Sequence, residues 1–142
     1  MTSRTLAKTI AHFALEKKAS DIVLMDLRGV TTTTDFFVIC SADSDTQVKA
    51  IADSIVEGTV TKGITVWHSE GMQALVWVVL DYVDVVVHVF HKEARRFYNL
   101  ERLWGDAKII EIMDEIGHTA QRKRRAKEQT MAGRPGKRKA MR

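Results

Sequence analysis

The segment that most constrains the fold is residues 77–90, which read Trp-Val-Val-Leu-Asp-Tyr-Val-Asp-Val-Val-Val-His-Val-Phe. β-Branched and aromatic side chains dominate this segment, as is typical of β-strands. Asp81 and Asp84 interrupt the apolar run near its centre and indicate a turn there. We therefore expect a β-hairpin, in which two neighbouring strands run antiparallel.

The turn decides which residues of the hairpin face each other. A two-residue turn at Tyr82 and Val83 would place Trp77 opposite His88. Tyr-Val is a poor sequence for such a turn, because a β-branched residue tolerates positive φ badly. A three-residue loop would exchange the two faces of the hairpin.

Successive strand side chains point to opposite faces of a sheet, so this register predicts a hairpin with two unlike faces. One face is wholly aliphatic and should belong to the core: Val76, Val78, Leu80, Val85, Val87 and Val89. The other face mixes large aromatics with acids: Trp77, Asp81, Asp84, His88 and Phe90. A mixed surface of this kind is either a second, half-buried layer or a binding surface.

Composition is that of one globular domain. The chain has 142 residues, of which 45% are hydrophobic and 28% are charged, so it can bury a real core. It contains no apolar run of about eighteen residues that could span a membrane. The first residues contain no apolar signal core, so we expect a cytoplasmic protein. Cys40 is the single cysteine and lies in an apolar run, so we expect it to be a small core residue.

Charge divides the chain into two parts. Residues 1–117 hold 12 Lys/Arg and 17 Asp/Glu, a net charge of −5, whereas residues 118–142 hold 10 and 1, a net charge of +9. The acidic body should prefer a basic partner, and the basic tail should prefer phosphates. We therefore predict a domain over 1–117 and a tail over 118–142 that passes from helix to disorder.

Apolar periodicity predicts the order helix, strand, strand, helix, three strands and then helices. Outside the hairpin, the predicted helices cover 3–18, 44–62, 92–104 and 106–116, and the predicted strands cover 21–27, 35–42 and 65–69. This order is typical of an α/β or α+β domain with a mixed sheet of about five strands. In the helix over 92–104, the residues at helical spacing should pack inward: Phe97, Tyr98, Leu100 and Trp104.

No constellation of residues indicates an enzyme, and we expect no catalytic residue, metal ligand or cofactor. Asp43 and Asp45 have a spacing that can hold a divalent metal, but capping of a helix is the commoner role. Asp81 and Asp84 could share a metal, although acids at a turn are usually solvated. Three histidines lack the helical i, i+4 pairing typical of zinc sites: His68, His88 and His91.

Several motifs, in order and at their spacing, resemble the ribosomal silencing factor family, also called Iojap. They span roughly residues 5–112 and lie at 21–27 (Asp-Ile-Val-Leu-Met-Asp-Leu), 34–39 (Thr-Asp-Phe-Phe-Val-Ile), 44–48 (Ser-x-x-Gln-Val), 51–53, 70–71, 77–90 and 96–104. Two features depart from the family pattern. Val83 stands where the family often has glycine, and the extension after about Gly117 lies outside the pattern.

This resemblance implies a fold related to nucleotidyltransferases without their catalytic apparatus, and it implies a homodimer. It also implies binding to ribosomal protein L-fourteen on the intersubunit face of the large ribosomal subunit. A protein bound there would prevent the small subunit from joining and would repress translation when nutrients are scarce. Relatives in organelles assist assembly of the large subunit.

The mixed hairpin face is the expected contact surface for this partner: Glu70, Trp77, Asp81, Tyr82, Asp84 and His88. Trp77 and Tyr82 would be aromatic anchors, and the acids would meet basic side chains of the ribosomal protein. Two alternatives remain open. One is a divergent nucleotidyltransferase that uses paired acids and a metal, and the other is a module for ribosome assembly in which the tail binds ribosomal RNA.

Overall fold

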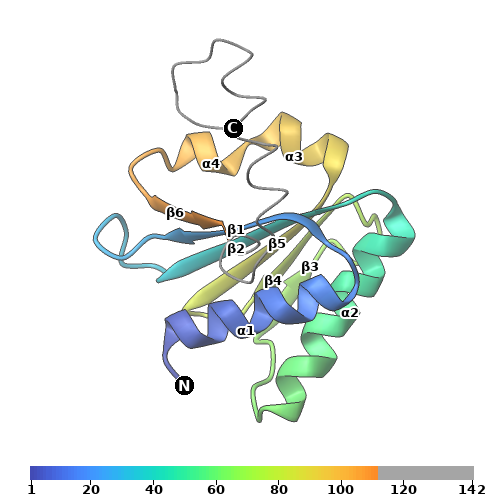
Figure 1. Cartoon of the computed structure of the whole chain (residues 1–142), viewed down its shortest axis with the longest axis horizontal. Coiled ribbons are helices and arrows are strands. Elements are labelled where there is room, and N and C mark those ends of the chain that lie inside the picture. Colours follow the sequence, from blue (N-terminus) through green and yellow to red (C-terminus); the bar gives the residue numbers. More distant parts are fainter. Residues whose placement is uncertain (112–142) are drawn as a thin grey trace.

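A six-stranded mixed sheet organises the part of the chain that the computed structural model describes, residues 1–111 (Figure 1). Its strands are β1 (Ser20–Asp26), β2 (Phe36–Ala42), β3 (His68–Glu70), β4 (Trp77–Asp81), β5 (Val85–His91) and β6 (Lys108–Glu111). They lie side by side in the order β3-β4-β5-β2-β1-β6. β2 and β5 run parallel, and the other neighbouring pairs are antiparallel.

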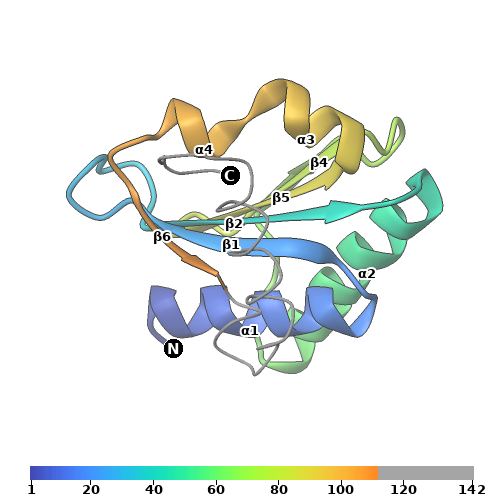
Figure 2. The same cartoon turned by 45° about the horizontal axis from the view of Figure 1, so that its top comes forward.

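Helices cover both faces of this sheet, which confirms the predicted α+β class (Figure 2). α1 (Ser3–Glu16) and α2 (Asp45–Thr61) lie on one face, and α3 (Lys92–Tyr98) and α4 (Leu100–Leu103) lie across the other. Within the described residues, no helix is long and apolar enough to cross a bilayer. The tail over 118–142 and its predicted change from helix to disorder lie outside the described residues.

The main core lies between the sheet and the layer formed by α1 and α2. The aliphatic hairpin face is buried there as predicted, with full burial of Val78, Leu80, Val85, Val87 and Val89. Val76 is the exception, because it precedes β4 and is 48% exposed. Cys40 lies in the same core, and its burial raises the pKa of the thiol to about 12. This cysteine is therefore a core residue, as expected.

The segment around Asp43 and Asp45 caps α2. Ser44 Oγ accepts a hydrogen bond from the Gln47 N–H at 3.2 Å, and Gln47 Oε1 accepts one from the Asp43 N–H at 2.7 Å. The Asp45 side chain accepts from the Thr46 N–H at 2.8 Å. Ser44 and Asp45 thus satisfy N–H groups at the start of the helix, which is the capping role that the sequence favours, whereas the Asp43 carboxylate lies 3.8 Å from Lys92 Nζ.

The hairpin register differs from the prediction by two residues. Trp77 faces Phe90 instead of His88. The turn is formed by Val83 and Asp84, one residue later than predicted. Because the shift in pairing is an even number of residues, each strand side chain keeps its predicted face.

Asp81 explains the position of the turn. Its Oδ1 accepts a hydrogen bond from the Val83 N–H at 2.7 Å, and the Tyr82 N–H donates to the Val85 carbonyl at 2.8 Å. These bonds hold Val83 at a φ of +73°, which is strained for a β-branched residue. The Asp81 carboxylate therefore stabilises this turn, although valine disfavours the positive φ that the turn requires.

Three predicted elements need correction. Residues 92–104 form two helices instead of one, because Asn99 is left-handed (φ +40°) and ends α3. Residues 108–111 form β6 along the edge of β1, where a helix over 106–116 was predicted. A short apolar run fits either element, and the edge of β1 offers it backbone hydrogen bonds. The rest of that predicted helix lies outside the described residues, and the strand predicted at 65–69 is displaced to 68–70.

Replacing Val83 with glycine should stabilise the fold, because glycine adopts positive φ without the steric cost that valine bears. Glycine also gains freedom in the unfolded chain, so we expect a net rise of about 1 kcal/mol in the free energy of unfolding, measured by urea denaturation. Val86→Gly is the matched control in β5 and should lower that free energy. A Val83→Gly protein less stable than the wild type would contradict the turn conformation.

Candidate partner-binding face

The second face of the sheet carries a cluster of aromatic rings around Trp77. We call these six residues the aromatic cluster: Phe37, Trp77, His88, Phe90, Tyr98 and Trp104. The centroid of the Trp77 ring lies 5.0 Å from that of Phe90 and 4.6 Å from that of Tyr98. Phe37 lies 4.5 Å from His88 and 5.9 Å from Trp104, in both cases edge to face. The cluster thus joins β2, β4 and β5 to the helices above them.

His88 is held neutral within this cluster. Trp77 Nε1 donates a hydrogen bond to His88 Nδ1 at 3.1 Å, and an indole N–H can only donate. The proton of the neutral imidazole therefore lies on Nε2. His88 is 6% exposed, and this burial lowers its pKa from the ordinary 6.5 to about 4. A neutral, oriented imidazole with a fixed proton is consequently part of the face near neutral pH.

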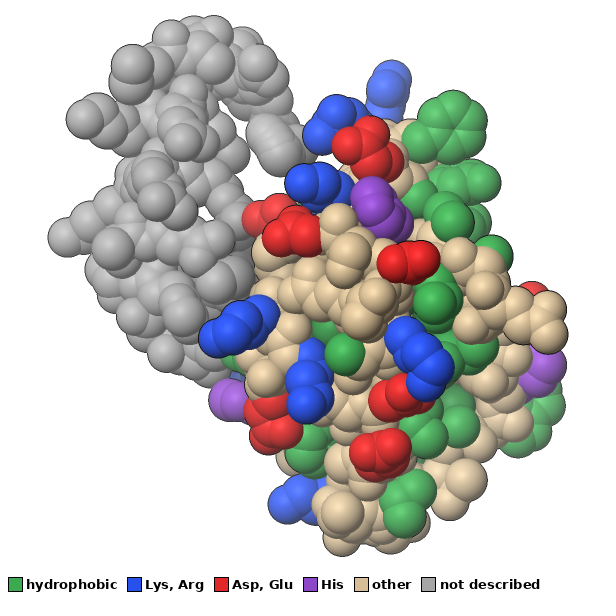
Figure 3. Space-filling view, turned by 90° about the vertical axis from the view of Figure 1, so that its right-hand side faces the viewer, with side chains coloured by type: hydrophobic (Ala, Val, Ile, Leu, Met, Phe, Trp, Pro, Cys, Tyr) green, Lys and Arg blue, Asp and Glu red, His purple; other side chains and the backbone are tan. Residues whose placement is uncertain are grey.

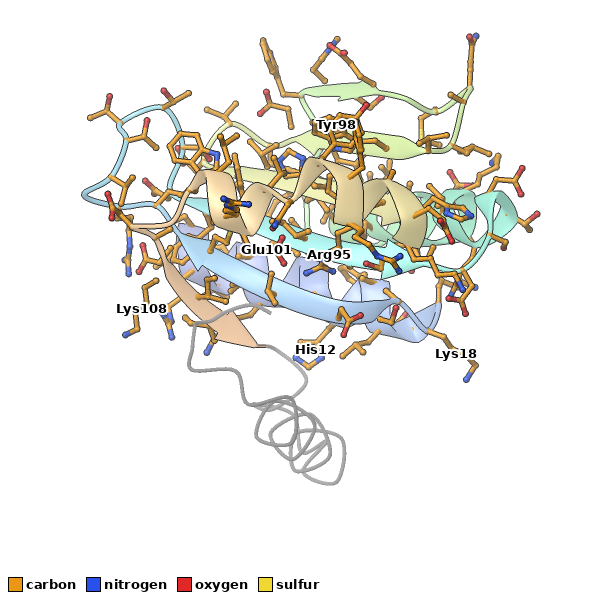
Figure 4. All side chains as sticks on the ribbon, turned by 90° about the horizontal axis from the view of Figure 1, so that it is seen from above. His12, Lys18, Arg95, Tyr98, Glu101 and Lys108 are labelled. Atoms are coloured by element: carbon orange, nitrogen blue, oxygen red, sulfur yellow. The ribbon has the colours of Figure 1, made fainter. Side chains whose placement is uncertain are left out.

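Arg95 anchors α3 and α4 over one half of the sheet (Figure 4). Its guanidinium donates to the Asp21 carbonyl at 2.5 Å, to Ser41 Oγ at 2.9 Å and to Glu101 at 2.6 Å. The Arg95 and Glu101 side chains are only 13% and 23% exposed, so this ion pair is screened less than a surface pair. Figure 4 shows Arg95 and Glu101 on the side towards β1 and β2, whereas Tyr98 lies on the side towards β4.

Large apolar side chains remain in solvent around this face. The strongly exposed ones are Trp67 (71%) and Val83 (54%), and on α3 and α4 themselves Phe97 (81%), Tyr98 (46%) and Leu103 (72%). Figure 3 shows a group of hydrophobic side chains at the upper right of the molecule and further ones, between other side chains, lower down that side. Exposed apolar surface of this kind is typical of interaction sites.

The prediction that Phe97 packs inward is wrong, and Tyr98 packs only one side of its ring against Trp77 and is 46% exposed. Leu100 is buried and Trp104 is half-buried, as predicted. The physical reason is the left-handed Asn99, which breaks the helix and changes the direction of the side chains before it relative to those after it. A single helix would have kept all four on one stripe.

Acidic side chains border the apolar surface. Asp81 is half-buried at the end of β4, and Asp84 is exposed in the turn. Glu70 is exposed on the edge strand β3 and contacts His68 Nε2 at 2.9 Å. Among the described residues, no group of three or more His, Cys, Asp or Glu side chains is arranged to hold a metal ion. These acids therefore add negative charge to the rim of an aromatic surface.

Tyr82 does not belong to this face, which corrects its predicted role as a partner-facing anchor. It is 7% exposed in the main core, and its hydroxyl is hydrogen-bonded to Thr59 of α2 at 2.8 Å. Burial raises the pKa of this phenol. Tyr82 follows Asp81, so alternation carries it to the same face as Leu80. The burial of Tyr82 was therefore predictable from the alternation of side chains along the strand.

The remaining predicted residues do come together, but sequence reasoning missed several neighbours. Trp77, Asp81 and His88 share the second face, with Asp84 and Glu70 at its edge. The missed residues are Thr34, Phe37, Trp67, Phe97 and Leu103. Trp67 was detectable as an aromatic within the strand predicted at 65–69, whereas nothing in the local sequence indicates that Thr34 approaches the hairpin.

Known proteins resemble this chain in sequence along most of its length. The family model described as ribosomal silencing factor during starvation matches residues 1–139. The chain belongs to the ribosomal silencing factor family. A ribosomal silencing factor of Bacillus subtilis is 43% identical over 112 residues, which cover 79% of this chain and 95% of that protein. The chloroplastic protein Iojap of Zea mays is 37% identical over 114 residues, 76% of this chain and 47% of that protein.

Solved structures agree with the fold of this ribosomal silencing factor. A crystal structure of a Chromobacterium violaceum protein superposes with a TM-score of 0.72 at 32% identity, and the match covers 76% of this chain and 90% of the other. A crystal structure from Bacillus halodurans gives a TM-score of 0.68 at 38% identity, covering 76% and 98%. Ribosomal silencing factors are not enzymes, so the prediction of a non-catalytic protein is confirmed and the nucleotidyltransferase alternative is wrong.

The buried His88 should make stability depend on pH. Its folded pKa of about 4 lies below the ordinary 6.5, so the unfolded chain binds the proton first as pH falls. Stability from this group is complete above pH 6.5 and is lost between pH 6.5 and 4. At about 1.4 kcal/mol per pKa unit, the loss is roughly 3 kcal/mol.

Urea denaturation between pH 7 and pH 4 measures this loss. His88→Gln should remove most of the decline, whatever its effect on stability at pH 7. His12→Gln is the matched control, since His12 is exposed on α1, and it should leave the decline unchanged. Equal declines in the wild type and His88→Gln would exclude a buried neutral imidazole.

Proposed function

We propose that this ribosomal silencing factor binds ribosomal protein L-fourteen on the large ribosomal subunit and thereby blocks joining of the small subunit. Obstruction of this kind needs a rigid surface and no chemistry. The observation that carries the proposal is the aromatic surface of the second sheet face, where the exposed Trp67 lines the same groove as Asp81 and the half-buried Trp77 lies on the same strand. Membership in the ribosomal silencing factor family supports a ribosomal partner.

The chemistry of the face suits a basic protein partner. Trp77 provides an aromatic anchor whose orientation is set by its hydrogen bond to His88. Asp81 and Asp84 meet basic side chains of the partner, which favours orientation and rate of encounter more than affinity. Glu70 extends the acidic rim on β3. The exposed side chains of α3 and α4 replace Tyr82 as further apolar contacts.

The proposal also includes a cytoplasmic homodimer that represses translation. The named chloroplastic relative from Zea mays supports a related role in an organelle, for which assistance in large-subunit assembly is the second candidate. The ten Lys/Arg residues of the tail favour contact with ribosomal RNA in either role.

Substitutions on the face should weaken binding to large subunits. We expect Trp77→Ala and Asp81→Lys each to reduce affinity by about tenfold or more, since buried aromatic anchors and charge reversal at an interface have effects of this size. Cosedimentation with purified large subunits measures the affinity, and the urea midpoint reports folding. Glu57→Lys, an exposed charge reversal on α2, is the matched control and should bind normally. Normal binding by both face variants would refute the assignment.

Removing the tail separates the proposed mode from binding through RNA alone. A chain ending at Gly117 loses a charge of +9, so it should bind large subunits more weakly and with a smaller dependence on salt. It should still bind, and it should still prevent subunit joining when added in excess. Complete loss of binding would show that the tail, and not the sheet face, carries the interaction.

A further inference from the structure

A groove crosses the candidate face beside the β4–β5 turn. Its volume is about 510 Å³, which is enough for an inserted side chain and its neighbours. The connector between β1 and β2 forms one side with Thr34, and Trp104 and Phe37 form aromatic walls. Val86 and His88 of β5 contribute to the lining, and Asp81 lies at the β4 end. The groove therefore combines apolar walls with a few polar groups.

Two of those polar groups lack a partner. Among the described residues, the buried side-chain polar atoms without a hydrogen bond are Thr34 Oγ1 and His88 Nε2. Both residues are 6% exposed, and both line this one groove. Native proteins satisfy nearly all buried polar atoms, and both unsatisfied atoms belong to residues that line this groove, so a ligand group in the groove could satisfy them.

The chemistry of these atoms restricts what can bind. His88 Nε2 carries the imidazole proton, because Nδ1 already accepts from Trp77. It therefore requires an acceptor, and the Thr34 hydroxyl can donate to or accept from the same group. The Phe37 ring packs against His88 at 4.5 Å, but an aromatic ring is a weak acceptor and leaves Thr34 unsatisfied.

Charge restricts the occupant further. A cation placed against the Nε2–H would meet a donor instead of an acceptor, and a buried anion would lie close to Asp81. An uncharged hydroxyl or carboxamide avoids both costs. Asp81 at the rim then favours a basic residue beside the inserted one.

We propose that this groove receives an uncharged side chain with a hydroxyl or carboxamide group from the ribosomal protein partner, bound by Thr34 and His88, with a basic neighbour at Asp81. The proposal rests on the proposed function and specifies the chemistry of the segment that is recognised. Both orphan atoms lie beneath the groove surface in the free protein, so insertion displaces a wall side chain. The half-buried Trp104, which follows the single-turn helix α4, is suited to this movement.

The test uses Thr34→Val in the full chain, because valine keeps the shape of threonine and removes only the hydroxyl. Affinity is measured with two probes, isolated ribosomal protein L-fourteen and intact large subunits. We expect Thr34→Val to weaken binding of both by about fivefold to tenfold. Thr32→Val, at an exposed position of the same connector, is the matched control and should bind as the wild type does.

Thermal stability gives a second readout, because removing a hydroxyl that only stabilises the fold would lower Tm. Since Thr34 has no partner in the free protein, Thr34→Val should leave Tm unchanged or raise it. A lowered Tm would overturn the proposal, because it would mean that the hydroxyl is already satisfied.

The binding results separate this proposal from the proposed function. If the wild type binds the isolated protein and Thr34→Val binds equally well, the groove proposal fails and the proposed function stands. If Thr34→Val weakens binding only to intact subunits, the occupant is not this protein and is instead a base of ribosomal RNA, which also overturns the proposal. If the wild type does not bind the isolated protein, the proposed function itself fails and the groove proposal fails with it.

Discussion

β2 and β5 pair in parallel at the centre of the sheet, from Phe36 opposite Val85 to Ala42 opposite His91, and the rest of the structure depends on this pairing. The two strands are far apart in the sequence, so their contact brings the N-terminal half of the chain against the hairpin. It places Phe37 next to His88 on one face, and it continues the aliphatic core on the other. The core buries one face under α1 and α2, which leaves the other face available for a different use.

Helices α3 and α4 cover only part of the second face of the sheet. Arg95 ties α3 and α4 to β1, β2 and each other, and this arrangement leaves the side of the sheet at β3 and β4 open to solvent. The open side is preorganised, because Trp77 is fixed by His88 and by the rings around it. A preorganised surface loses less entropy on binding than a flexible one. Such a surface suits the binding to the large ribosomal subunit that is proposed above.

Strand alternation made much of this face predictable. The two faces of the hairpin, the burial of Cys40 and the cap of α2 follow from local rules that involve only neighbouring residues. Trp77, Asp81 and His88 were predicted together for the same reason. Tyr82 was assigned to the wrong face although the period of the strand places it with Leu80. This assignment was wrong because the turn was predicted one residue too early. The hydrogen bond from the Val83 N–H to Asp81 fixes the position of the turn.

The sequence by itself determined α1, α2, β1, β2 and the two faces of the hairpin, because periodicity and capping are local properties of the chain. Only the tertiary structure decided that residues 108–111 become an edge strand, since their hydrogen-bond partners lie on β1, more than eighty positions earlier. It likewise decided that Phe97 is exposed and that Thr34 and His88 line the same groove. These outcomes depend on contacts between distant segments, and the energy of such contacts overrides weak local preferences.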